Sequence, residues 1–166
     1  HINPLQEFVQ KEGKYDKICI KLLLRKIIEE NKFPMIFKGV GMGLNKKDAE
    51  YFVKLKPYAI DVAGAGGTNW TKIEFLRNKK AKYFSEQLLE WGISTKQSII
   101  NTIEAKKNTQ EQTNTLVIAS GGVWSGIDAV KSLLLGADYV GFALPALRAV
   151  MKGGEEELPL VARRCQ

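Results

Sequence analysis

The stretch Asp61-Val-Ala-Gly-Ala-Gly-Gly-Thr-Asn-Trp70 joins an apolar run to a glycine-rich loop and then to polar side chains. The apolar run, residues 58–62, is typical of a buried strand, and three glycines follow within four residues, at Gly64, Gly66 and Gly67. Because glycine has no side chain, such a loop lets the backbone come close to a bound ligand. The stretch therefore predicts a ligand site at a strand end, although a plain glycine-rich turn has the same local pattern.

Length and composition are those of one globular domain. The chain has 166 residues, 45% of them hydrophobic and 26% charged, and could bury about two-thirds of its unfolded surface. We expect neither a membrane span nor a signal peptide, because no apolar run approaches the roughly 20 residues of a span. Cys19 and Cys165 lie far apart without a Cys-x-x-Cys motif, which argues against a zinc site or a disulfide framework. A reducing cytoplasm is the expected compartment.

The net charge of +7 is compatible with two kinds of partner. Nucleic-acid binding is one, and a site for phosphorylated ligands is the other. The lysines are spread along predicted helices and do not form a basic arm with interleaved aromatic residues. Most of them are therefore expected on solvated helix faces, and no nucleic-acid partner is expected.

Four apolar runs predict buried parallel strands, each leading into a helix. They cover residues 35–38, 58–62, 115–119 and 139–143. Continuous apolar runs, not alternating ones, are expected where helices cover a parallel sheet.

The helices between these strands are marked by caps and by apolar periodicity. They are expected at 16–31, 45–55, 125–136 and 145–153, with two more in the insertion 71–114. Capping pairs are Asn45 with Asp48, Ser94 with Gln97, and Ser125 with Asp128. On the first helix of the insertion, Phe84, Leu88 and Trp91 are expected to face inward.

Each predicted strand ends in polar or glycine residues, which parallel strands bring to one edge of a sheet. Lys38 closes the first strand and precedes Gly39 and Gly41, so it is expected to face an anionic group. Glycine-rich exits at 120–122 and 141–143 each lead toward a helix N-terminus, which indicates a phosphate held by backbone N–H groups. Neither exit matches a P-loop or a dinucleotide-binding glycine motif.

Four strands are half of the eight that close a (β/α)8 barrel. The sequence starts at His1 without a methionine, opens with the polar cluster 1–7, and stops at 161–166 without a closing helix. We therefore expect residues 1–166 to be the C-terminal half of one barrel, truncated at both ends. His1 would then lie at the end of a missing fourth strand.

Several motifs resemble, in order, type 2 isopentenyl-diphosphate delta-isomerase, the flavin-dependent isomerase of isoprenoid biosynthesis. They are His1-Ile-Asn-Pro-Leu-Gln-Glu7, Phe37-Lys38 with Val40-Gly41-Met-Gly43, Ile60-Asp-Val-Ala-Gly-Ala-Gly-Gly-Thr-Asn-Trp70, Trp91-Gly-Ile-Ser-Thr95, Ile118-Ala-Ser-Gly-Gly122 and Gly136-Ala-Asp-Tyr-Val-Gly-Phe-Ala143. The first motif together with Gly66-Gly-Thr-Asn-Trp70 is specific, whereas Gly-Gly before a helix is shared by many flavin barrels.

The resemblance implies an α/β fold, a (β/α)8 TIM barrel that binds FMN, of which this chain would be the C-terminal half. It implies interconversion of isopentenyl and dimethylallyl diphosphate by a 1,3 proton shift, with Mg2+ bridging to the diphosphate and NADPH reducing the flavin. It also implies a cytoplasmic homo-oligomer, a tetramer or an octamer.

The site residues of the resembled family carry over to positions of this sequence. Lys38 and Thr68 would contact the flavin, and its phosphate would be cradled by Gly121, Gly122, Val123, Ala143 and Leu144. Gln6 would line the substrate pocket, and His1 and Asn3 would lie beside the diphosphate and the isoprenyl group. Glu7 would bind Mg2+, which needs few carboxylates when phosphate oxygens are also ligands.

Three positions depart from the family pattern. Gly39 stands where glutamate is usual, Trp124 stands where arginine follows Gly-Gly-Val, and residues 10–13 lack the usual proline. Trp124 would weaken phosphate binding, whereas backbone N–H contacts would remain. The N-terminal half of the family also carries diphosphate contacts, so we expect residues 1–166 alone to be inactive.

Two alternatives remain beside the isomerase. An FMN-dependent α-hydroxyacid oxidase or dehydrogenase needs a base histidine and an arginine after the sixth strand, and residues 66–70 contain neither. A non-catalytic binding module or fragment is the other: the retained Lys38, Thr68, Gln6 and Glu7 argue against deliberate loss of function, whereas the truncated ends allow an inert fragment. Because the sequence supplies no His–Asp pair or carboxylate dyad, the reduced cofactor is the best candidate for the proton carrier.

Overall fold

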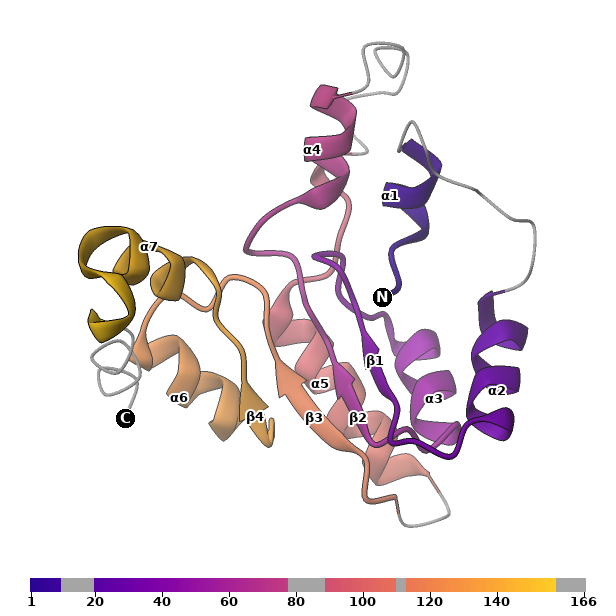
Figure 1. The fold of residues 1–166 in the computed structure, drawn as a ribbon. Helices are drawn as coiled ribbons and strands as arrows, with labels where there is room; N and C mark the ends of the chain where they lie inside the picture. The colour runs from indigo at the N-terminus through magenta and orange to yellow at the C-terminus, as the bar shows by residue number, and fades with distance from the viewer. Residues whose placement is uncertain (10–19, 78–88, 110–112, 158–166) are drawn as a thin grey trace.

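The computed structural model describes residues 1–9, 20–77, 89–109 and 113–157, which form a parallel sheet with surrounding helices (Figure 1). The strands are β1 (Ile36–Lys38), β2 (Ala59–Asp61), β3 (Leu116–Ala119) and β4 (Tyr139–Val140). The helices described are α1 (Pro4–Val9), α2 (Ile20–Glu30), α3 (Lys46–Lys54), α4 (Trp70–Arg77), α5 (Thr95–Asn108), α6 (Gly126–Leu134) and α7 (Leu144–Gly153), followed by the 3-10 turn η3 (Gly154–Glu157).

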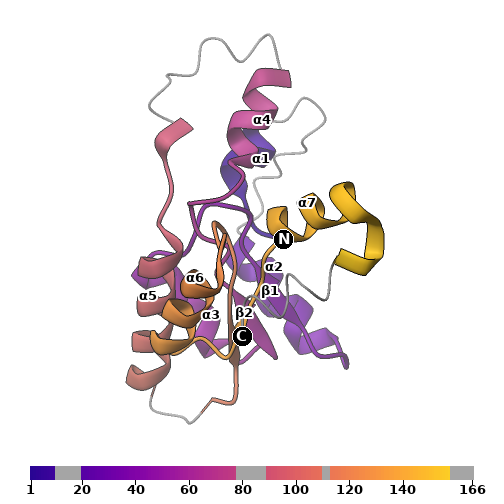
Figure 2. The ribbon, with the colours of Figure 1, turned by 90° about the vertical axis from the view of Figure 1, so that its left-hand side faces the viewer.

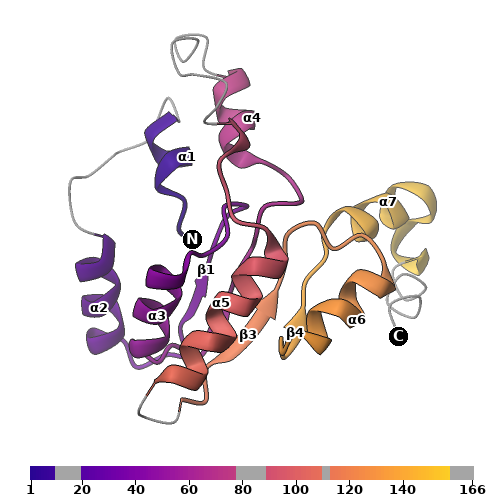
Figure 3. The ribbon, with the colours of Figure 1, turned by 180° about the vertical axis from the view of Figure 1, so that it is seen from behind.

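The sheet has the order β1-β2-β3-β4, and every neighbouring pair is parallel. Parallel neighbours need long crossovers, and these carry α3, then α4 and α5, then α6. Helices α3, α5 and α6 pack on one face of the sheet (Figure 3). Sequential parallel strands with helices on the outside are the arrangement of half a (β/α)8 barrel, as predicted.

The N-terminal residues lie beside the C-terminal end of β1. Ile2 pairs in parallel with Gly39, and its N–H donates to the carbonyl of Lys38 at 2.8 Å. Helix α1 then starts at Pro4. Proline suits the first helical position, because an N–H there would have no partner within the helix and proline has none to leave unpaired. Helices α1 and α4 lie next to each other beyond the strand ends (Figures 1 and 2).

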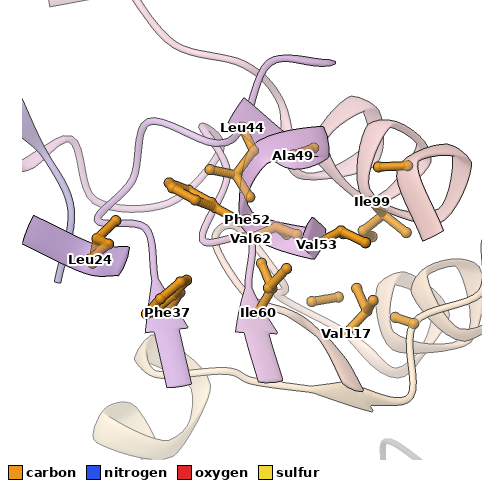
Figure 4. Close-up of a cluster of buried hydrophobic side chains, with 13 residues drawn as sticks. Leu24, Phe37, Leu44, Ala49, Phe52, Val53, Ile60, Val62, Ile99 and Val117 are labelled. Atoms are coloured by element: carbon orange, nitrogen blue, oxygen red, sulfur yellow. The ribbon is translucent and has the colours of Figure 1, made fainter. Parts of the chain in front are cut away.

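The hydrophobic core lies between the sheet and the helices that cover it (Figure 4). Phe37, Ile60 and Val117 extend from successive strands, and Phe37 meets Phe52 of α3 edge to face with ring centroids 5.6 Å apart. Helix α3 presents Ala49, Phe52 and Val53 to this core, an i, i+3, i+4 stripe. The core therefore fixes β1, β2 and β3 against α3 and α5.

All three predicted capping pairs are present. Asn45 and Ser94 each accept the backbone N–H three residues ahead, and Ser125 forms a reciprocal capping box with Asp128. The inner face of α5 carries buried polar side chains: Ser98 accepts the N–H of Leu44, and Asn101 donates to the Leu44 carbonyl. These bonds tie α5 to the loop before α3.

The prediction that Trp91 faces inward on a helix is wrong. Trp91 is 63% exposed and lies in a non-helical segment before the Ser94 cap of α5, so helical periodicity does not reach it. Phe84 and Leu88 fall outside the described residues. The strand predicted over 139–143 is also shorter, since Gly141 to Ala143 turn toward α7 after β4. Among the described helices, none is long and apolar enough to cross a membrane.

Replacing Ile60 by alanine tests the position of the core. Ile60 is completely buried in β2, so Ile60→Ala is expected to lower the free energy of unfolding of the full-length protein by about 2–5 kcal/mol. Ile127→Ala is the matched control, because Ile127 is 68% exposed on α6 and its truncation should cost under about 0.5 kcal/mol. Chemical denaturation measures both, and equal losses would contradict this core.

Candidate functional site

A pocket of about 700 Å3 opens at the C-terminal ends of the strands. This volume lies within the roughly 300–1,000 Å3 typical of small-molecule and cofactor sites. Among the residues predicted from sequence, those that line it are His1, Asn3, Gln6, Lys38, Thr68, Gly121, Gly122, Val123, Ala143 and Leu144. The parallel sheet has thus brought together segments that are far apart in the chain. Glu7 lies in α1, but its side chain is outside the described part of the structure.

Lys38 meets two side chains that the sequence alone did not assign to the site. Its Nζ lies 2.5 Å from Oδ2 of Asp61 and 3.4 Å from Oγ of Ser120. The Ser120 hydroxyl donates to Asp61 Oδ1 at 2.6 Å, and the Ala63 N–H donates to the same oxygen at 3.2 Å. Lys38 and Asp61 are direct partners in the β1–β2 register. The sequence signals for this cluster were the polar residues at three strand ends, with Lys38 expected to face an anionic group.

The loop after β3 offers free backbone donors to the pocket. Gly121 and Gly122 have φ of 96° and 74°, and with Val123 they line the pocket. Within the described chain, the N–H groups of these residues form no hydrogen bond. Consecutive free N–H groups of this kind form an anion-binding concavity.

The two helices that follow the glycine-rich exits differ at their N-termini. The start of α6 is closed by the Ser125–Asp128 capping box, whereas Ala143 before α7 provides no side-chain cap. Hydrogen bonds from the Ser125 hydroxyl and the Trp124 N–H lower the pKa of Asp128 and so keep this cap ionised. The uncapped N-terminus of α7 is therefore the better anion site, because its dipole and its first N–H groups remain available, apart from Pro145, which has none.

Backbone-to-backbone packing holds this loop in place. A β-carbon at Gly122 would lie 2.5 Å from the carbonyl carbon and oxygen of Gly66, and one at Gly121 would lie 2.2 Å from the carbonyl oxygen of Gly64. The Thr95 hydroxyl also donates to the carbonyls of Ser120 and Gly121. The two loops can therefore be this close only because glycines stand at these points of contact.

Asn3 links α1 to the pocket wall. Its Nδ2 donates to the Val40 carbonyl at 2.8 Å, and its Oδ1 accepts the Gln6 N–H at 2.9 Å. Because its side-chain amide has two backbone partners and the residue is only 5% exposed, Asn3 is held in one place. Asn3 thereby positions His1 and Gln6 at the rim of the pocket. Across the described residues there is no group of three His, Cys, Asp or Glu side chains that could hold a metal ion.

Comparison with known proteins agrees with this geometry. A protein-family model described as FMN-dependent dehydrogenase matches residues 6–163. Isopentenyl-diphosphate delta-isomerase of Methanococcus aeolicus is 41% identical over 97% of the chain and 46% of its own length. The same-named protein of Methanococcus maripaludis is 39% identical over 98% of the chain, again 46% of its own length. The predicted resemblance is confirmed, and the chain spans less than half the length of these curated relatives.

Solved structures with related folds are more distant in sequence. A flavocytochrome b2 variant with pyruvate bound has a TM-score of 0.64 at 17% identity, covering 93% of this chain and 33% of its own. A mandelate oxidase variant has a TM-score of 0.58 at 18% identity, covering 87% of this chain and 38% of its own. At this level of identity the likeness concerns the fold, and it confirms the predicted half of a TIM barrel.

Gly122→Ala tests the contact between the two loops. Gly122 and Gly154 both have left-handed φ, 74° and 71°, so alanine at either position costs about 1–3 kcal/mol of backbone strain. A β-carbon at Gly154 meets nothing within 4 Å, whereas at Gly122 it meets the Gly66 backbone. Gly122→Ala is therefore expected to lower the thermal unfolding midpoint more than Gly154→Ala. Equal shifts in calorimetry would show that the loops are not packed this way.

Proposed function

The chain belongs to the FMN-dependent dehydrogenase family, and we propose that the whole protein uses FMN to interconvert isopentenyl and dimethylallyl diphosphate. The curated relatives carry the name of this isomerase. The observation that carries the proposal is the loop 64–70, which lines the pocket through Gly64, Gly67, Thr68 and Trp70. It contains neither the histidine nor the arginine that would deprotonate and bind a hydroxy acid, so it favours an isomerase over an α-hydroxyacid oxidase.

The described residues fit FMN. The free N–H groups of 121–123 and the uncapped start of α7 suit a phosphate with two negative charges. In the proposal Gly121, Gly122, Val123, Ala143 and Leu144 hold this phosphate, and Lys38 and Thr68 contact the ring system. Ala63, Gly64 and Gly67 leave room for a flat ring close to the backbone.

The side chains of the pocket bind and orient; they offer little acid–base chemistry. Asp61 accepts three hydrogen bonds, from Lys38, Ser120 and the Ala63 N–H, and is therefore not free to act as a base. Isopentenyl diphosphate has no acidic proton that a weak base could remove. Bound reduced FMN would supply the proton exchange, and the chain's own residues would hold the ring, the phosphate and the substrate in register.

We propose that the substrate and Mg2+ bind at the rim of the pocket. His1, Asn3 and Gln6 line the pocket, and we place the diphosphate and the isoprenyl group beside them. In this scheme Glu7 binds Mg2+, whose other ligands are diphosphate oxygens and water, and NADPH reduces the flavin. Because Asn3 is fixed by the Val40 carbonyl, the N-terminal turn is held against β1 as such a site requires.

The architecture of the whole protein is part of the same proposal. Residues 1–166 would form the C-terminal half of one FMN-binding barrel, which the sequential order of the four strands supports. A homo-oligomer, a tetramer or an octamer, is proposed, and exposed apolar side chains at Leu134 and Met151 are available for further burial. The proposed compartment is the cytoplasm.

Purification of the full-length protein tests the cofactor. It is expected to show flavin absorbance bands that bleach when NADPH is added, and to convert isopentenyl diphosphate. Lys38→Met should weaken FMN binding about 10–100-fold because a charged hydrogen bond is lost. Lys54→Met, at the exposed end of α3, is the control and should leave FMN affinity unchanged. A colourless protein that does not bind added FMN would argue against the proposal.

Substitution of 5-deazaFMN for FMN tests the proposed proton carrier. The analogue keeps the phosphate and the ring shape, so it should bind with similar affinity, but it alters N5. Turnover measured with labelled isopentenyl diphosphate is expected to be lost. Full activity with the analogue would show that a side chain and not the cofactor moves the proton.

A further inference from the structure

The positive charge of Lys38 is paired with the negative charge of a carboxylate in the wall of the pocket. Its ammonium lies 2.5 Å from Asp61 Oδ2, and the other oxygen of that carboxylate accepts from Ser120 and from the Ala63 N–H. All three side chains line the pocket. They come from the ends of β1 and β2 and from the residue after β3, so the sheet itself sets their spacing.

Burial makes this pair different from an ion pair on the surface. Asp61 is 7% exposed as a residue, and a carboxylate at that depth is costly unless it is paired and hydrogen-bonded. The Lys38 side chain is 39% exposed and reaches the open side of the pocket. One of its three N–H bonds is directed at Asp61 and a second at Ser120, which leaves one for a ligand.

We propose that Asp61 is a positioning residue that holds Lys38 with Ser120 and cancels its charge, an inference whose flavin part rests on the proposed function. The lysine then meets the flavin as a directed hydrogen-bond donor of a neutral pair. A free lysine would instead stabilise the anionic reduced ring with its full charge. Asp61 thereby limits how strongly the protein favours the reduced flavin.

A comparison of the stability of two variants tests the pairing without any flavin. Lys38→Met strands a buried carboxylate and is expected to lower the thermal unfolding midpoint of the flavin-free full-length protein by about 4 °C. Adding Asp61→Asn removes that stranded charge, so the double variant is expected to be more stable than Lys38→Met alone. If the double variant is no more stable than Lys38→Met, the proposal is wrong. The comparison needs only these two proteins, so it stands even where Asp61→Asn alone does not fold.

The midpoint potential of bound FMN tests the effect on the cofactor. Asp61→Asn keeps the shape and an acceptor for Lys38 but removes the negative charge, so the potential is expected to rise relative to the unchanged protein. Asp138→Asn is the matched control. Asp138 also accepts a backbone N–H, from Val117 at 2.7 Å, and pairs with a lysine, Lys106 at 3.9 Å, but it does not line the pocket.

The two experiments separate failure of this inference from failure of the proposed function. If the unchanged protein binds no FMN, the proposed function fails, and the stability comparison of the two variants still decides whether Asp61 neutralises Lys38. If FMN binds and Asp61→Asn leaves the potential unchanged or lowers it, the inference is wrong while the function stands. A raised potential with Asp61→Asn, together with an unchanged one with Asp138→Asn, supports the inference.

Discussion

Parallel pairing in chain order is the constraint on which the site depends. Because β1 to β4 all run the same way, the residues that follow them meet at one edge of the sheet, whatever their distance in sequence. Lys38 and Asp61 are 23 positions apart, and Ser120 is a further 59 along the chain. A one-residue slip of β2 against β1 would turn Asp61 away from the lysine and the pocket.

The glycines of the two central loops are required by packing as well as by ligand access. The loop after β2 lies directly against the loop after β3, and the Thr95 hydroxyl at the start of α5 fixes the second of them. The free N–H groups at 121–123 are thus held rigidly before any anion arrives, which lowers the cost of ordering on binding. Cofactor binding and loop packing both depend on these glycines.

Much of the fold could be predicted from local patterns. Apolar runs located the strands, and Asn45, Ser94 and Ser125 located helix starts, because caps act on the residues next to them. Pocket membership followed as well, since strand ends converge in any parallel sheet. The partners of Lys38 could not be predicted, because they depend on register between strands. Trp91 was misplaced because apolar spacing alone does not show where a helix ends.

A second cavity, of about 630 Å3, shares the segment 121–123 with the first and is also bordered by Ser94, Thr95 and Lys131. The segment common to both cavities has two glycines and one larger residue, a valine. It leaves little room for adaptive change, since a β-carbon added at either glycine strikes the neighbouring loop. Natural variation that changes the ligand preference of this pocket therefore has to occur at its margin, where the half-exposed residues Trp70 and Trp124 lie.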